Sequence, residues 1–214
     1  MLKLYVIPVS LYCAKLRILL RYKKLDWEEV PPPGGYGSDE YKQVVPSGNL
    51  PALQDGDLLL GDSETIAEYL EEKFPTPAAL PKDTNQRAKL RELSRFHDTR
   101  LEPELRKLFP HIRPENRDKS TVDRQADELN AKLTQLSILL QSVERPSPDH
   151  LTLADCGFPI SFAWMDLLQV RMEFSIEWPG KVREYRSQIE AFPAIAHELA
   201  DYIPKLSSWL VEAD

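Results

Sequence analysis

The sequence has few cysteines and no long apolar segment. Two cysteines in 214 residues, Cys13 and Cys156, stand far apart and give no disulfide framework. No window approaches the roughly 20 apolar residues that a helix needs to cross a bilayer. The apolar N-terminus, residues 1–9, is too short for a signal peptide and has no small-residue cleavage site. We therefore expect a soluble, cytoplasmic protein with no membrane partner.

The sequence also lacks an excess of positive charge and a histidine pattern typical of metal sites. Its 27 basic and 34 acidic residues give a formal net charge of −7. Nucleic-acid binding needs a basic surface, so we expect no nucleic-acid partner. We expect no metal either, because the four histidines show no metal-ligand spacing. They are His97, His111, His150 and His197.

The residues that are present change pattern between two parts of the chain. Residues 1–75 alternate strand-like and helix-like segments, and the order βαβ(α)ββα predicts an α/β, thioredoxin-like domain. A loop is expected at Pro31–Gly37, and a hairpin turn at Asp55–Gly56. The expected strands are Leu2–Ile7, Trp27–Val30, Ala52–Gln54 and Leu58–Leu60, and the expected helices are Leu11–Lys24 and Ser63–Lys73.

The second part of the chain favours helices throughout. Prolines at 75, 77 and 81 predict a linker, which we place at residues 76–84, and residues 85–214 predict an all-α domain. Its prolines at 146 and 148 should separate two helices. The expected helices are Asn85–Leu108, Ser120–Val143, Thr152–Val170, Lys181–Glu190 and Ala194–Leu210.

Ser10 is the first candidate for chemistry, because it lies between the first strand and the first helix. Thioredoxin-like proteins carry a Cys-x-x-Cys pair there, and the helix N-terminus favours a thiolate. The segment here reads Ser10-Leu-Tyr-Cys13, so thiol–disulfide exchange through the first position is lost. A hydroxyl there can still donate a hydrogen bond to a bound thiolate. The alternative is that Ser10 only caps the helix.

Leu50-Pro51 is the second candidate, because it stands directly before a predicted strand. Thioredoxin-like folds place a cis-proline at this point. The arrangement leaves the backbone N–H and C=O of Leu50 ready to bind a peptide as an added strand. The alternative is a proline that simply opens an edge strand.

Asp62-Ser63 is the third candidate, at the start of a predicted helix. We expect Ser63 to cap this helix, whose free N–H groups suit a carboxylate, while Asp62 can pair with an ammonium group. Such a site recognises an amino-acid headgroup, although an ordinary helix cap is the alternative. Together the three candidates predict a peptide-like ligand with a thiol directed at Ser10.

Three segments resemble the glutathione-binding domain of the cytosolic glutathione S-transferases. They are Ser10 to Arg17, Val45–Pro51 and Leu60–Leu70. Leu151–Asp155 resembles the family's folding box, in which Thr152 caps a helix and Asp155 reaches back to the cap backbone, a structural role. The resemblance covers essentially the whole chain.

The resemblance implies glutathione as cosubstrate and a small hydrophobic electrophile as its acceptor. It implies activation of the thiol by Ser10, as in the serine-dependent zeta and tau classes, with Tyr12 or Cys13 as alternatives. Asn49 stands where the family commonly has Lys or Gln. The implied glutathione-binding residues are Asn49, Leu50, Pro51, Asp62 and Ser63, and the possible substrate-site residues are Tyr12, Arg100, Phe109 and Trp164.

Three activities are compatible with this resemblance. The first is conjugation by a glutathione S-transferase. The second is a glutathione-dependent isomerase or dehalogenase, and the third is a non-catalytic protein that keeps the fold for interactions. The resemblance also implies a homodimer, formed by the helices Ser63–Lys73 and Asn85–Leu108, which we expect to be apolar beyond the needs of one core face.

Overall fold

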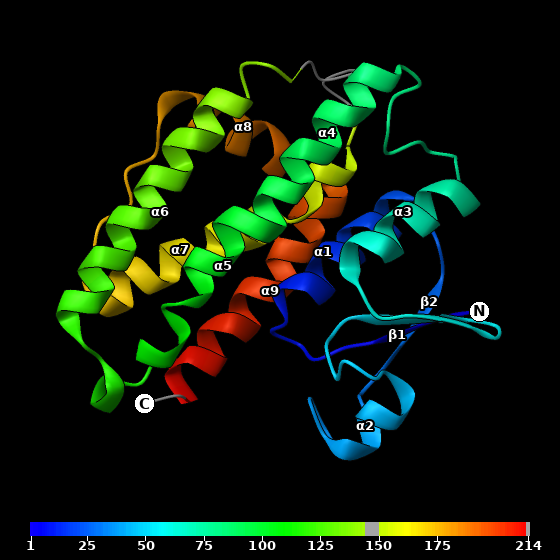
Figure 1. Ribbon diagram of the computed structural model, residues 1–214, viewed down its shortest axis with the longest axis horizontal. Coiled ribbons are helices and arrows are strands. Elements are labelled where there is room, and N and C mark those ends of the chain that lie inside the picture. The colour runs from blue at the N-terminus through cyan, green and yellow to red at the C-terminus, as the bar shows by residue number, and fades with distance from the viewer. Residues whose placement is uncertain (144–149, 213–214) are drawn as a thin grey trace. The chain divides into compact units, whose positions relative to one another are not determined.

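The computed structural model describes residues 1–143 and 150–212, and the predicted helix-ending prolines at 146 and 148 lie outside them. The chain forms two compact units, Met1–Ala79 and Leu80–Asp214 (Figure 1). Their boundary falls within residues 76–84, where the sequence predicts a linker. The limits of the functional domains stay a prediction.

The N-terminal unit is a four-stranded mixed sheet with three helices. The strand order is β2-β1-β3-β4, with β1 parallel to β2 and antiparallel to β3, and β3 antiparallel to β4. This confirms the predicted thioredoxin-like α/β fold. The elements are β1 (Leu2–Tyr5), α1 (Leu11–Tyr22), β2 (Trp27–Val30), α2 (Asp39–Val44), β3 (Ala52–Asp55), β4 (Leu58–Leu60) and α3 (Ser63–Lys73).

Helix α1 is the central helix of this unit, since nine of its twelve residues are buried. It ends before the predicted Lys24 because that residue adopts a left-handed backbone, with φ 54°. Two buried lysines, Lys15 within α1 and Lys23 at its C-cap, pair with α3. The Nζ of Lys15 lies 2.6 Å from Glu64 Oε2, and the Nζ of Lys23 lies 2.6 Å from Glu71 Oε2.

The Lys23–Glu71 pair also fixes the chain that follows α3. The Lys23 ammonium donates to the carbonyls of Phe74, at 2.7 Å, and Pro77, at 3.0 Å. The N–H of Ala79 donates to Glu71 Oε2 at 2.9 Å. Residues 74–79 are therefore held by the N-terminal unit, although the sequence places a linker over most of them.

The C-terminal unit is helical, as the sequence predicts. Within residues 80–143 and 150–212 no helix is long and apolar enough to span a bilayer. Nor do the described residues contain three or more His, Cys, Asp or Glu side chains grouped to hold a metal ion. The main helices are α4 (Thr84–Phe96), α5 (Glu102–Arg106), α6 (Lys119–Leu139), α7 (Phe158–Met172), α8 (Gly180–Glu190) and α9 (Pro193–Glu212).

The prediction of one continuous helix over Asn85–Leu108 is wrong. A π-helical turn, His97–Leu101, separates α4 from α5. Pro103 lies in the first turn of α5 and has no N–H to continue the hydrogen-bond ladder, so the preceding turn widens. The buried His97 ring lies here, with Nδ1 2.7 Å from Asp98 Oδ1 and Nε2 2.8 Å from Ser161 Oγ.

The predicted helix Thr152–Val170 is also divided. A 3-10 turn, Leu153–Cys156, comes first, and α7 begins after Gly157. Pro159 stands in the first turn of α7, where a missing N–H is tolerated. Gly157 leaves room for the buried histidine of the π-helical turn, because a Cβ at position 157 would lie 2.5 Å from the His97 ring.

Candidate glutathione-binding edge of the sheet

The strand pairing brings the three sequence candidates to one edge of the N-terminal sheet. Tyr5, at the end of β1, pairs with Ala52, at the start of β3. Leu60, at the end of β4, pairs with Leu53 near the same start. The loop to α1, the approach to β3 and the loop to α3 therefore leave the sheet at the same edge, and Figure 1 shows α1 and α3 beginning there. We call this place the sheet-edge site; its residues are Ser10, Asn49, Leu50, Pro51, Asp62 and Ser63.

Ser10 is the N-cap of α1 and is half-buried. Its Oγ accepts a hydrogen bond from the N–H of Cys13, at 3.3 Å. That contact uses a lone pair of the oxygen, so the hydroxyl proton stays available for a second partner. Capping and thiolate binding are therefore compatible roles for this one side chain.

The surroundings of Cys13 do not favour redox chemistry. Its side chain is fully buried, and its Sγ lies 3.9 Å from the carbonyl oxygen of Tyr5. Burial raises the pKa of the Cys13 thiol, and this outweighs the lowering by the hydrogen bond with Ser10. Because the thiolate is the nucleophile, a buried thiol of raised pKa is a poor one.

The Leu50–Pro51 peptide bond is cis. Leu50 is buried, and within the described part of the chain its backbone N–H and C=O make no backbone hydrogen bond. The preceding residue is fixed: the Tyr41 hydroxyl donates to the carbonyl of Asn49 at 3.0 Å, and the N–H of Asn49 donates to Ser47 Oγ at 3.2 Å. The Asn49 side chain itself is exposed.

At the start of α3 the predicted cap is wrong by one residue. Asp62, and not Ser63, is the N-cap: its Oδ1 accepts from the N–H of Thr65 at 2.8 Å. Ser63 is the first helical residue and is 8% exposed. Asp62 is exposed, so the carboxylate keeps lone pairs for an ammonium group while it caps the helix. A Cβ on the neighbouring Gly61 would lie 3.0 Å from Val45, which shows how closely the loops approach.

Two of the four possible substrate-site residues lie together in the C-terminal unit. The rings of Phe109 and Trp164 stack, with centroids 4.5 Å apart. Trp164 is 2% exposed, and its Nε1–H donates to the Tyr202 hydroxyl at 2.8 Å. Its ring therefore lies beneath the protein surface and is not part of it. Arg100 is exposed, and Tyr12 is half-buried in the first turn of α1, in the other unit.

Phe109 lines an open groove of about 440 Å³ in the C-terminal unit. Trp209, from α9, lines it too and contacts the buried Trp164 edge-to-face, with centroids 5.9 Å apart. Trp209 was not among the predicted substrate-site residues, since nothing in the pattern of its helix relates it to Phe109. The groove is lined by Phe109, Pro110, Ile112, Arg113, Asn116, Trp209 and Glu212.

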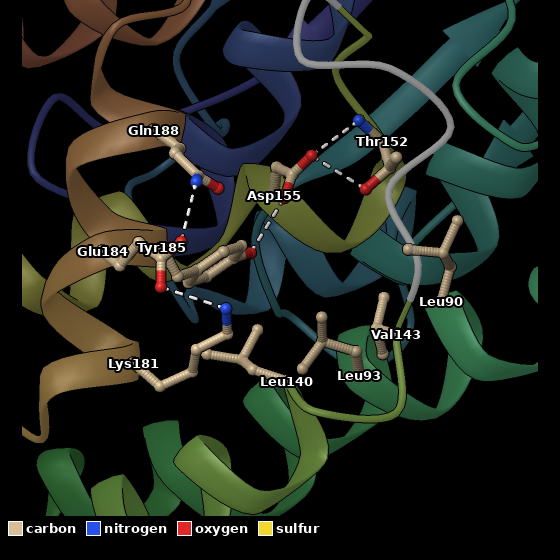
Figure 2. A pocket seen from close by; sticks show the side chains of 10 residues that line it. All are labelled: Leu90, Leu93, Leu140, Val143, Thr152, Asp155, Lys181, Glu184, Tyr185 and Gln188. Carbon is tan, nitrogen blue, oxygen red and sulfur yellow. Dashed lines mark hydrogen bonds and ion pairs between the residues drawn. The ribbon is translucent and has the colours of Figure 1, made fainter.

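Thr152 and Asp155 form a capping box at the start of the 3-10 turn. Asp155 Oδ2 accepts from the N–H and from the hydroxyl of Thr152, both at 2.8 Å. Its Oδ1 accepts from the hydroxyl of Tyr185 in α8, at 2.9 Å, a contact that the sequence did not predict (Figure 2). This network borders a small pocket of about 70 Å³, whose apolar wall includes Leu90 and Leu140.

Comparison with known proteins agrees with this geometry. A sequence model described as "Glutathione S-transferase, N-terminal domain" matches residues 4–78. Glutathione S-transferase Z1 of Arabidopsis thaliana is 41% identical over 90 residues, which is 41% of each chain. Maleylacetoacetate isomerase of Pseudomonas aeruginosa is 38% identical over 97 residues, 42% of this chain and 45% of that protein.

The chain carries a glutathione S-transferase N-terminal domain at residues 4–78 and has the glutathione transferase fold. Its likeness to the zeta-class members spans less than half of their own length. Over the whole chain the transferase fold is matched by solved structures. The match with the structure of glutathione S-transferase III in apo form covers 94% of this chain and 96% of that chain, with a TM-score of 0.74 and 26% identity. Glutathione transferase F7 of Populus trichocarpa covers 94% and 99%, with a TM-score of 0.78 and 22% identity.

Proposed function

We propose that this protein binds glutathione at the sheet-edge site and activates its thiol for attack on a small hydrophobic electrophile. The observation that carries the proposal is the convergence at one edge of two capped helix starts and a backbone segment, at Leu50, that makes no backbone hydrogen bond. Each element suits one part of the tripeptide. Asp62 and Ser63 hold the γ-glutamyl end, Leu50 pairs with the cysteinyl backbone, and Ser10 receives the thiol.

The chemistry required of Ser10 is modest. A free thiol of this kind has a pKa of about 8.5–9, so little of it is ionised at neutral pH. Lowering that pKa by two units needs about 2.7 kcal/mol, which one charge-assisted hydrogen bond and the N-terminal dipole of α1 can supply. Ser10 is then the donor that stabilises the thiolate, and the sulfur of glutathione is the nucleophile.

The electrophile meets an apolar surface in this proposal. In the C-terminal unit, the groove lined by Phe109 and Trp209 has the aromatic rings that favour contact with a flat apolar molecule. Asn49 is the least favourable residue of the proposed glutathione site, because its short uncharged side chain is a poor partner for the glycyl carboxylate. Calorimetric titration with glutathione tests the binding part of this proposal, since a protein that keeps only the fold has no measurable affinity.

An isomerase is the second candidate function, because a maleylacetoacetate isomerase is among the relatives of the N-terminal unit. In that reaction the thiolate adds to the substrate and later leaves. The two functions differ in stoichiometry: a transferase consumes one glutathione for each product formed, whereas an isomerase regenerates it. Measuring free thiol over many turnovers separates them.

Removing the charge of Asp62 should weaken glutathione binding. We expect Asp62→Asn to lower the affinity roughly 10- to 100-fold, because the ligand's ammonium loses a charged partner. Asparagine keeps the capping oxygen, so the helix start is preserved. Asp83→Asn is the matched control, since Asp83 caps α4 in the same way, through the N–H of Gln86 at 2.9 Å. Unchanged affinity of Asp62→Asn would reject the placement of the γ-glutamyl end.

We also propose a homodimer, on the family resemblance alone. The predicted surplus of apolar residues on α3, α4 and α5 is not found: among the described residues the large exposed hydrophobic side chains lie on other elements. The chain mass is 24.6 kDa, so sedimentation equilibrium should give about twice that value. A monomer at micromolar concentration that still binds glutathione would show that the assembly is not needed.

A further inference from the structure

The buried ion pair Lys15–Glu64 joins the two helices of the sheet-edge site. The ammonium and the carboxylate are 2.6 Å apart, and the two side chains are 2% and 10% exposed. Burying two charges is unfavourable unless their geometry is well defined. The pair takes no part in the bond-making steps of conjugation or isomerisation, so any role in the reaction must be indirect.

The pair lies next to the residues that the proposed function uses. Glu64 directly follows Ser63 in the first turn of α3, and Lys15 lies little more than one turn after Ser10 in α1. Helices α1 and α3 pack against each other and begin at the same sheet edge (Figure 1). Their N-terminal dipole ends are alike in sign and repel, so a link at this point opposes their separation.

An ion pair sets a distance more strictly than an apolar contact does. Apolar side chains slide over one another at little cost, because the hydrophobic effect has no preferred direction. A buried hydrogen-bonded pair has one favourable geometry, and displacement leaves a charge without its partner. Lys15 and Glu64 thus hold the start of α1 at a fixed spacing from the start of α3.

We propose that Lys15 and Glu64 are positioning residues that set the spacing between the thiol end and the γ-glutamyl end of the glutathione site. This inference rests on the proposed function. Neither residue touches the ligand: both act through the helix starts that carry Ser10, Asp62 and Ser63. Since displacement of a reacting group by about 1 Å can reduce activity 100-fold, a loosened spacing should be measurable.

The chain contains a matched control for this proposal. Lys23–Glu71 joins the same two helices, is equally short at 2.6 Å and is equally buried, with side chains 0% and 6% exposed. It lies at the opposite ends of α1 and α3, away from the sheet-edge site. Because Lys23 and Glu71 also hold residues 74–79, we expect loss of this control pair to destabilise the fold at least as much as loss of Lys15–Glu64.

The first experiment compares Glu64→Gln with Glu71→Gln. For Glu64→Gln we expect the calorimetric dissociation constant of glutathione to rise about tenfold or more. We also expect the ultraviolet titration of the bound thiolate, at saturating glutathione, to move up by roughly one pH unit, which is about three- to fivefold less thiolate at neutral pH. Glu71→Gln should leave both values near those of the wild type. Equal effects of the two variants, or none from Glu64→Gln, would overturn the proposal.

A second comparison covers the case that a single variant does not fold. The double variant Lys15→Met/Glu64→Leu leaves neither of these charges buried, and replacement of a buried pair by apolar residues is often tolerated. Its control is Lys23→Met/Glu71→Leu. Without ligand, amide hydrogen exchange at Cys13 and Thr65, whose N–H groups bond to Ser10 and Asp62, should be faster in the first variant than in the control.

The two comparisons separate the inference from the proposed function. Wild-type protein that binds no glutathione would reject the function, and the exchange rates would then decide alone whether the pair holds the helix starts. Equal exchange in the two double variants would reject the pair as a positioning device even if glutathione binds.

Discussion

Ser10→Ala should reduce the thiolate form of bound glutathione by up to about 50-fold at neutral pH. The methyl group cannot donate a hydrogen bond. Loss of the whole pKa shift of about two units, about 2.7 kcal/mol, is the upper limit, because the N-terminal dipole of α1 remains. The measurement is the ultraviolet absorbance of the bound thiolate against pH, with turnover of an electrophile measured in parallel. Both should fall together, because the thiolate is the attacking species.

The Ser10→Ala variant also loses a helix cap, so two controls are needed. Ser38 caps α2 in the same unit, accepting from the N–H of Tyr41 at 3.0 Å, and Ser38→Ala should leave the thiolate absorbance unchanged. Ser10→Thr keeps a hydroxyl and should restore most of the absorbance. If absorbance and turnover both survive in Ser10→Ala, Tyr12 becomes the better candidate, because Cys13 is buried as a thiol of raised pKa.

Asp155→Ala should strongly destabilise the C-terminal unit. Asp155 is 1% exposed and its carboxylate accepts three hydrogen bonds, two from Thr152 and one from Tyr185. Their loss leaves buried donors without partners, and we expect at least about 3 kcal/mol of destabilisation. For a chain of this length that lowers the melting temperature by roughly 6–12 °C, which a thermal unfolding scan measures.

Two control variants show how much of the stability lost in Asp155→Ala comes from individual hydrogen bonds. Tyr185→Phe removes one of the three hydrogen bonds and should cost about 1 kcal/mol. Asp118→Ala removes an exposed cap, that of α6, and should destabilise the protein less than Asp155→Ala does. Glutathione affinity should stay near the wild-type value in all three. A stable Asp155→Ala protein that no longer binds glutathione would mean that this box serves the ligand site instead of the fold.

Local sequence signals were sufficient for much of the N-terminal unit. The bounds of Trp27–Val30 and Ser63–Lys73 could be predicted because capping residues, β-branched residues and apolar spacing act over short distances. The choice between Asp62 and Ser63 as cap could not, since both residue types cap well and only the backbone decides between them. The Lys15–Glu64 pair was not predicted because it joins residues 49 apart in sequence.

The C-terminal unit shows where local signals fail. The predicted helix Asn85–Leu108 contains Pro103, and the wide turn before this proline is stabilised by a contact of His97 with Ser161, 64 residues away. The stacking of Phe109 on Trp164 and the hydrogen bond from Tyr185 to Asp155 are likewise long-range. Such contacts depend on packing, which local patterns in a sequence do not contain.

The attachment of residues 74–79 to Lys23 and Glu71 determines where the chain can be cut. A fragment of the N-terminal unit that ends at residue 75 would lose the Pro77 carbonyl, which accepts from the Lys23 ammonium, and the Ala79 N–H, which donates to Glu71. A buried ammonium would then keep fewer acceptors than it has in the intact chain. A fragment for expression or spectroscopy should therefore extend through Ala79 and not end where the prolines predict the start of a linker.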